Sequence, residues 1–88
     1  MRTVDALDGN AIGGLLREVF RAEMTAAPGT CVACGTTAPV AEAVVYLRAP
    51  GTVVRCRTCG SLLMVFVRKE GMTCVDLRGL AALDAPPA

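Results

Sequence analysis

Histidine and tryptophan are absent from this chain of 88 residues, and aromatic residues make up only 3% of it. Without histidine the chain has no Ser–His or Cys–His catalytic pair and no catalytic zinc site with a histidine ligand. The eight carboxylates are spread singly along the sequence, so no paired acid and base is evident. These absences argue against an enzyme.

Long apolar runs are also absent. The longest one, Leu62–Val67, has six residues, whereas a membrane-spanning helix needs about 20. Residues Met1–Asn10 carry Asp5 and Asp8 without an apolar core, so no signal peptide is expected. The five cysteines are an odd number, which does not suit a disulfide framework. We therefore expect a cytoplasmic protein with reduced thiols and no membrane contact.

Charge of either sign is modest. Nine basic and eight acidic residues give a formal net charge of +1, and a zinc ion held by four thiolates would bring it to about −1. Nucleic-acid binding is possible but not favoured, because it would require scattered basic residues to share one face. We expect such binding to be weak and salt-sensitive at most. The residues concerned are Arg48, Arg55, Arg57, Arg68, Lys69 and Arg78.

Aliphatic residues are what the chain has in excess. Apolar residues make up 53% of it and are mainly Ala, Val and Leu. A chain of this size buries only about 60–65% of the surface that its unfolded form exposes, so its core alone is marginal. Small domains of this kind usually depend on a metal ion, disulfides or a partner chain. We expect one domain over residues 1–88 that binds a protein partner or forms a homo-oligomer.

The most informative feature is a Cys-x-x-Cys-Gly motif that occurs twice, at Cys31–Gly35 and Cys56–Gly60. Each motif closes a tight turn that directs two thiolates at one ion, and two such turns complete a tetrahedral sulfur shell that suits zinc. The glycines can adopt positive φ and let backbone amides turn toward the sulfurs. The sequence predicts one structural zinc ion per chain. Its predicted ligands are Cys31, Cys34, Cys56 and Cys59.

Other uses of these cysteines remain open. Iron would suit the same four thiolates, as a minor alternative that implies electron transfer. Redox-active Cys-x-x-Cys pairs are less suited, because each motif is followed by glycine and then β structure rather than by a helix. Cys74 lies apart in a predicted strand, where a free cysteine usually acts as a small apolar residue.

A helix is predicted over residues 10–26. Its apolar residues recur at helical spacing from Asn10 to Met24 and form one stripe. Asp8 or Asn10 is the expected N-cap, and Pro28-Gly29 is expected to end the helical region. The stripe consists of Ile12, Leu15, Leu16, Val19, Phe20 and Met24.

Short runs of strand-forming residues follow, separated by turns. The turns at Pro50-Gly51 and Glu70-Gly71 are too short for a parallel crossover, so antiparallel hairpins are expected. The expected fold is therefore a small α+β domain with an N-terminal helix, an antiparallel sheet of three to four short strands within residues 30–78, and a disordered tail at 84–88. The predicted strands are Val40–Leu47, Thr52–Arg55, Leu62–Arg68 and Met72–Leu77.

The run Leu62–Val67 is apolar at both even and odd positions. A strand of this kind is usually buried on both faces. The predicted helix can cover one face. We expect the other face to be covered by the segment Leu77–Leu83 or by a second copy of the protein.

The paired motifs, with one hairpin between them and another after them, resemble a zinc ribbon or a rubredoxin-like site over residues 30–77. The whole chain is similar to small bacterial hypothetical proteins of unknown function, in which an opening like Asp8-Gly-Asn-Ala11 precedes the same cysteines. The first resemblance implies a zinc-ribbon-like sheet with a bound metal. Zinc ribbons serve in transcription, translation and subunit adaptors, so neither resemblance selects a function.

Overall fold

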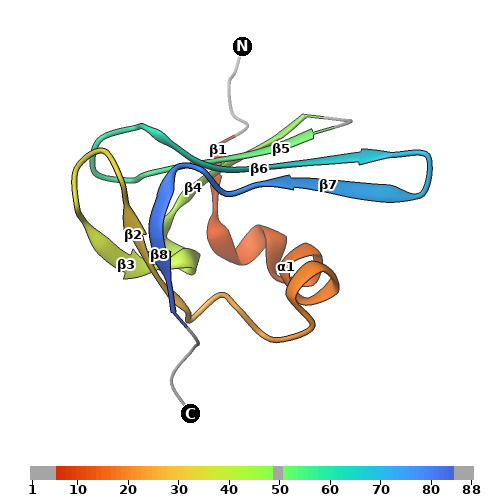
Figure 1. Cartoon of the computed structure of the whole chain (residues 1–88), viewed down its shortest axis with the longest axis horizontal. Coiled ribbons are helices and arrows are strands. Elements are labelled where there is room, and N and C mark those ends of the chain that lie inside the picture. Colours follow the sequence, from red (N-terminus) through yellow and green to blue (C-terminus); the bar gives the residue numbers. More distant parts are fainter. Residues whose placement is uncertain (1–5, 49–50, 85–88) are drawn as a thin grey trace.

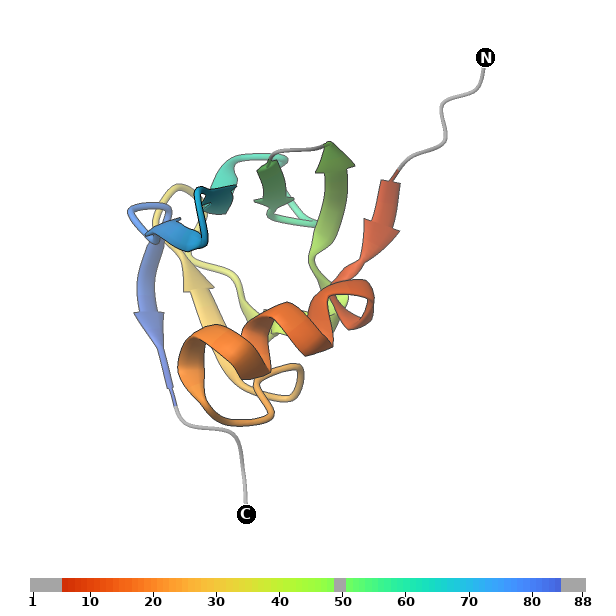
Figure 2. The ribbon, with the colours of Figure 1, turned by 90° about the vertical axis from the view of Figure 1, so that its right-hand side faces the viewer.

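The computed structural model describes residues 6–48 and 51–84. Within these residues eight strands form two antiparallel sheets around one short helix (Figures 1 and 2). The strands are β1 (Ala6–Asp8), β2 (Pro28–Cys31), β3 (Thr37–Pro39), β4 (Val44–Arg48), β5 (Gly51–Arg55), β6 (Leu62–Lys69), β7 (Met72–Asp76) and β8 (Leu80–Leu83). The five-stranded sheet has the order β1-β4-β5-β6-β7, and the three-stranded sheet has the order β3-β2-β8.

The structure confirms the small α+β class and the N-terminal position of the helix, but the predicted count of three to four strands is wrong. The additional strands β1, β2, β3 and β8 have only three or four residues each, and β2 begins with Pro28-Gly29. Proline and glycine normally argue against a strand. These segments become strands because of their partners. β1 pairs with β4 and β8 with β2, which are distant in the sequence, and β2 pairs with β3 across the first cysteine loop.

The helical region is shorter than predicted. A 3₁₀ turn, η1 (Gly9–Ile12), leads into α1 (Gly13–Phe20), and the predicted cap residue Asp8 accepts a hydrogen bond of 3.0 Å from the Asn10 amide. The prediction of helix as far as residue 26 is wrong, because Arg21 adopts a left-handed conformation with φ of 61°. Downstream, Thr25 donates its amide and hydroxyl to the Glu23 carboxylate, which favours a local turn over helix.

The core lies between α1 and one face of the five-stranded sheet, which we call the inner face (Figure 2). Leu16 and the strand residues opposite it are almost fully buried. Met24 also reaches this core, although it lies beyond the end of the helix. The buried cluster consists of Ile12, Leu16, Met24, Ala27, Val40, Ala43, Val45, Val54, Met64 and Phe66.

Both predicted hairpins are present. β4 pairs with β5 up to Arg48 and Gly51, although Pro50 of the predicted turn lies outside the described residues. β6 pairs with β7 across Glu70-Gly71, which both have positive φ, as a type I′ turn requires. The predicted strand Val40–Leu47 is correct only in its second part, because Val40–Glu42 form a 3₁₀ turn (η2) that buries Val40.

The opposite side of the five-stranded sheet, which we call the outer face, has no cover among the described residues. Alternation along the strands places half-buried and exposed apolar side chains there, and Met72 is 64% exposed. Leu62 joins them because the register of β5 and β6 shifts between Val54 and Arg55, which leaves Leu63 on the core side. Leu77, Leu80 and Leu83 pack against the buried cluster instead, so the C-terminal segment does not cover the outer face as we considered. The apolar residues of the outer face are Val44, Tyr46, Val53, Leu62, Val65, Val67, Met72 and Cys74.

The C-terminal strand β8 is held at its end by a hydrogen bond of 2.9 Å from the Asp84 amide to the Pro28 carbonyl. Most of the predicted disordered tail, residues 85–88, lies outside the described residues. In the described part of the chain, no helix has the length and apolar character needed to cross a membrane.

Two neighbouring residues of β6 should differ strongly in how much stability an introduced carboxylate costs. Met64→Glu places a carboxylate at a site that is 1% exposed, and we expect a loss of about 4 kcal/mol or more in the free energy of unfolding. Val65→Glu places it on the outer face, where we expect a change of about 1 kcal/mol or less. Urea unfolding of the metal-loaded proteins measures both. Equal losses would contradict the assignment of faces.

Gly79 connects the two sheets at a place where no side chain fits. Its amide bonds to the Leu63 carbonyl at 3.2 Å, and an added Cβ would lie 2.6 Å from Leu63 Cα. We expect Gly79→Ala to lower the free energy of unfolding by about 1–3 kcal/mol. The matched control is Gly14→Ala on α1, which meets nothing within 4 Å and should raise stability by about 0.5–1 kcal/mol. A neutral Gly79→Ala would contradict this close approach of Gly79 to β6.

Candidate metal centre

The two cysteine motifs meet where the two sheets join. Cys31 is the last residue of β2, and Cys34 lies in the loop that leads to β3. Cys56 and Cys59 lie in the loop between β5 and β6. One motif therefore belongs to the three-stranded sheet and the other to the five-stranded sheet, so any ion held between them would link the two.

The four sulfur atoms have the spacing of a tetrahedral shell. All four Sγ atoms lie within 4.8 Å of one another, and Cys31–Cys59 and Cys34–Cys56 are each 3.7 Å apart. A tetrahedron with metal–sulfur bonds of about 2.3 Å has sulfur–sulfur edges of about 3.8 Å. A disulfide would require about 2.05 Å, so these four thiols are not paired covalently. The donor set and its geometry fit a single metal ion.

The two loops have the same backbone construction. In each one, the amide of the glycine donates to the carbonyl of the first cysteine at 2.9 Å. Gly35 and Gly60 adopt φ of 78° and 79°, which confirms the expected use of glycine at this position. The amide of each first cysteine also bonds to the residue just beyond its glycine, Thr36 or Ser61. These bonds give the two loops the same shape.

Hydroxyl groups beside the second cysteine of each motif favour the thiolate. The side chain and amide of Ser61 bond to Cys59 and lower the pKa of its thiol to about 6. Thr36 Oγ1 lies 3.1 Å from Cys34 Sγ and lowers the pKa of that thiol in the same way. Ser61 therefore favours the thiolate form of Cys59, the form that binds a metal ion.

The pKa of the Cys31 thiol, by contrast, is raised. The amide of Cys34 lowers the pKa of the Cys31 thiol, but burial and the neighbouring thiols of Cys59 and Cys34 more than compensate, and the pKa lies above its ordinary value. A metal cation would remove this conflict, because it favours the thiolate of every ligand.

The shell is half-buried in a regular way. Cys31 and Cys56, the first cysteines of the two motifs, are 3% and 6% exposed, whereas Cys34 and Cys59 are exposed. Arg55 donates a hydrogen bond of 3.0 Å to the Gly60 carbonyl and so supports the second loop from its side. With all four positions occupied by sulfur, the shell leaves no position for a water or substrate. The site is therefore suited to a structural role.

The remaining sequence predictions fall outside this centre. Cys74 lies on β7, exposed and separate from the other four cysteines. Within residues 6–48 and 51–84, no other group of cysteines and carboxylates has the spacing to hold an ion. The roles of Thr36 and Ser61 were not predicted from the sequence. A signal was available, because a hydroxyl residue follows the glycine in both motifs.

Residues 2–88 match the model of DUF6510, a family of unknown function, and the chain belongs to that family. The match agrees with the predicted similarity to hypothetical proteins of unknown function, and it does not identify a zinc-ribbon family. No curated protein and no solved structure matches the chain.

Replacing one ligand should remove the ion, whereas replacing the fifth cysteine should not. We expect Cys56→Ser to lose bound metal or to bind it far more weakly, because only three thiolates remain. Cys74→Ser should retain one metal ion per chain. Elemental analysis of the purified proteins measures the stoichiometry. The four-sulfur site would be wrong if Cys74→Ser lost the ion and Cys56→Ser kept it.

The serine beside Cys59 should set the acid limit of metal binding. Protons compete with the metal for each thiolate, so release occurs as the pH falls. Because Ser61 lowers the pKa of Cys59, Ser61→Ala should raise that pKa and shift metal release to a higher pH. The measurement is the cobalt–thiolate absorbance of the cobalt-substituted protein during acid titration. Thr58→Ala in the same loop is the control, and an equal shift there would contradict this role of Ser61.

Proposed function

We propose that this chain is a non-catalytic protein-interaction module that is stabilised by one zinc ion and presents its outer face to a protein partner. The observation that carries this proposal is the uncovered apolar side of the five-stranded sheet. Half-buried valines on three adjacent strands form its centre, and Leu62 and Met72 at its margins are 41% and 64% exposed. Exposed apolar patches of this kind are typical of interaction sites.

Zinc is the ion that best suits the centre. It has no ligand-field preference and forms closed four-thiolate shells in structural sites. Iron fits the same sulfur spacing and would make the protein an electron carrier. The two ions are separated by elemental analysis and by colour, because an iron–thiolate protein is red and zinc is colourless. A red protein with one iron per chain would replace the zinc proposal.

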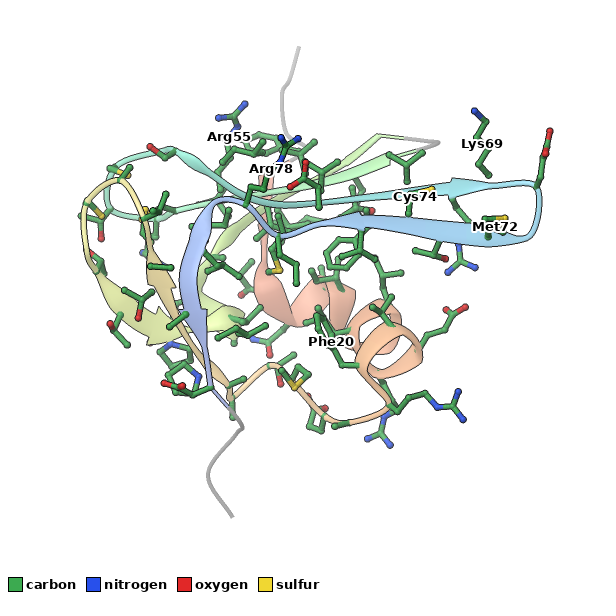
Figure 3. The ribbon with its side chains drawn as sticks, viewed as in Figure 1. Phe20, Arg55, Lys69, Met72, Cys74 and Arg78 are labelled. Carbon is green, nitrogen blue, oxygen red and sulfur yellow. The ribbon has the colours of Figure 1, made fainter. Side chains whose placement is uncertain are left out.

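An interaction role also agrees with the position of the charges. Arg68 turns toward the helix and pairs with Glu18 at 2.9 Å, and Arg78 pairs with Asp76 at 2.7 Å. Arg68 and Arg78 are therefore each paired with a carboxylate, and they lie on opposite sides of the sheet. Figure 3 shows Arg55, Lys69 and Arg78 on the side of the sheet opposite Phe20 of the helix. Arg57 lies in the metal loop, and the side chain of Arg48 lies outside the described part of the chain.

Site-specific photo-crosslinking in cells of the native organism tests the proposal. A benzophenone amino acid replaces Val53 on the outer face or, as a control, the exposed Glu23 beyond the helix. We expect a discrete protein adduct from position 53 and none from position 23. Val65→Glu, combined with the probe at position 53, should abolish the adduct. The proposal fails if position 53 gives no adduct or if both positions give the same one.

A further inference from the structure

The outer edge of β7 is a second surface without a partner, because its backbone amides and carbonyls have no neighbouring strand within residues 6–48 and 51–84 to pair with. β7 ends the five-stranded sheet, and no strand among the described residues pairs with its far side. Figure 1 shows the β6–β7 hairpin extending away from the three-stranded sheet. The strand has neither proline nor a bulge, the devices that often protect natural edges from pairing. Met72 and Val75 on it are 64% and 38% exposed.

The hairpin determines which backbone groups point outward. Its turn joins Lys69 and Met72 through the hydrogen bond of a β-turn, so these two residues form a hydrogen-bonded pair. Pairs alternate along an antiparallel ladder, and Cys74 therefore also bonds inward to β6. The amides and carbonyls of Thr73 and Val75 consequently point to the open edge.

We infer that a second copy of this chain pairs with β7 in antiparallel register, centred on Cys74, and joins the two five-stranded sheets into one sheet of ten strands. In this register Thr73 lies opposite Val75 of the second copy, and Val75 lies opposite its Thr73. The outward backbone groups of both strands are then satisfied. Each of these pairs also joins two β-branched side chains, which is a favourable cross-strand combination.

Other symmetric registers either bring like charges together or overlap fewer residues of the two strands. A centre at Thr73 would place Asp76 opposite Glu70 of the second copy, which brings two like charges together. A centre at Val75 would leave Met72 opposite Arg78 of the second copy, beyond the end of its strand. Only the centre at Cys74 overlaps the whole of Met72–Asp76 with itself. The strand is thus self-complementary, which favours a second copy over an unrelated strand.

This pairing also enlarges the apolar outer face to the area that a stable interface needs. With strands about 4.8 Å apart and about 17 Å long, the face of one copy spans about 400 Å². A stable protein interface takes about 800 Å² from each partner. The centred register places both outer faces on the same side of the joined sheet and doubles the apolar area. This step rests on the proposed function, whereas the pairing of the edges does not.

Disulfide trapping of the metal-loaded protein tests the register. Opposed residues of a non-hydrogen-bonded pair have Cα atoms about 4.5 Å apart, within the range that a disulfide spans. Diamide removes two electrons and two protons from a pair of thiols and becomes the hydrazine as the S–S bond forms. We expect brief treatment to link two wild-type chains through Cys74, as seen by non-reducing electrophoresis and peptide mass analysis. Cys74→Ser should give no linked dimer.

Moving the cysteine separates specific pairing from chance collision. In the Cys74→Ser background, Thr73→Cys and Val75→Cys should each fail to link alone, because identical positions lie about 8 Å apart in this register. An equal mixture of the two should link, since these positions are directly opposite at about 5.5 Å. Linking of either single variant as fast as the wild type would overturn the inference, as would an unlinked wild type.

A proline variant tests the edge without any cysteine. Val75→Pro removes an amide that points outward, so the β6–β7 ladder should remain intact while pairing is lost. Sedimentation should show a dimer for the wild type at high protein concentration and a monomer for the variant, which should keep its metal and its circular dichroism. A wild type that stays monomeric contradicts the inference. If Val75→Pro does not fold, the trapping experiment still decides.

The outcomes also separate this inference from the proposed function. Trapping at Cys74 without any adduct from the probe at position 53 would support the dimer and reject the outer-face partner. An adduct from position 53 without trapping would support the partner and reject the paired edge. A dimer formed by the two outer faces against each other would be lost in Val65→Glu, and its Thr73 and Val75 cysteine variants would not follow the predicted pattern.

Discussion

Four sulfur atoms arranged as a tetrahedron are the constraint on which the rest of this structure depends. Cys31 ends a strand of the three-stranded sheet, and Cys56 follows a strand of the five-stranded sheet. An ion held by both loops fixes the angle between the two sheets and closes one end of the core. The chain is small and its apolar core marginal, so a cross-link of this kind replaces cohesion that a larger core would provide. The hydroxyls of Thr36 and Ser61 lower the pKa of the exposed thiols Cys34 and Cys59 and so favour the thiolate form that binds a metal ion.

The same small size explains the apolar outer face. One eight-residue helix can cover only one side of a five-stranded sheet, and the three-stranded sheet closes the core from its end (Figure 2). The side chains that would cover the outer face of a larger domain are not among the described residues. Apolar residues on both sides of β6 therefore serve two purposes: Met64 and Phe66 fill the core, and Val65 and Val67 remain for contacts outside the chain. This division is the basis of the proposed interaction function.

Sequence patterns predicted the parts of the structure that local chemistry determines. The cluster of four cysteines follows from the repeated Cys-x-x-Cys-Gly motif, and β5, β6 and β7 follow from runs of valine and leucine between turns. The end of the helix at Phe20 was missed because Arg21 departs from the helix while the apolar spacing continues to Met24. β2 was missed because Pro28-Gly29 normally marks a break, yet it pairs with both β3 and β8. Such pairings depend on distant residues and on the metal-binding loops between them, which no short window of sequence contains.

Removal of the metal tests the central claim most directly. Structural zinc sites contribute apparent binding free energies of about 10–16 kcal/mol in small peptides at neutral pH, which exceeds the stability expected of a domain of this size. A strong chelator at neutral pH, with metal loss verified by elemental analysis, should abolish the β-sheet signal in far-ultraviolet circular dichroism, and added zinc should restore it. An unchanged spectrum after verified metal removal would show that the two sheets hold together without the four-sulfur link.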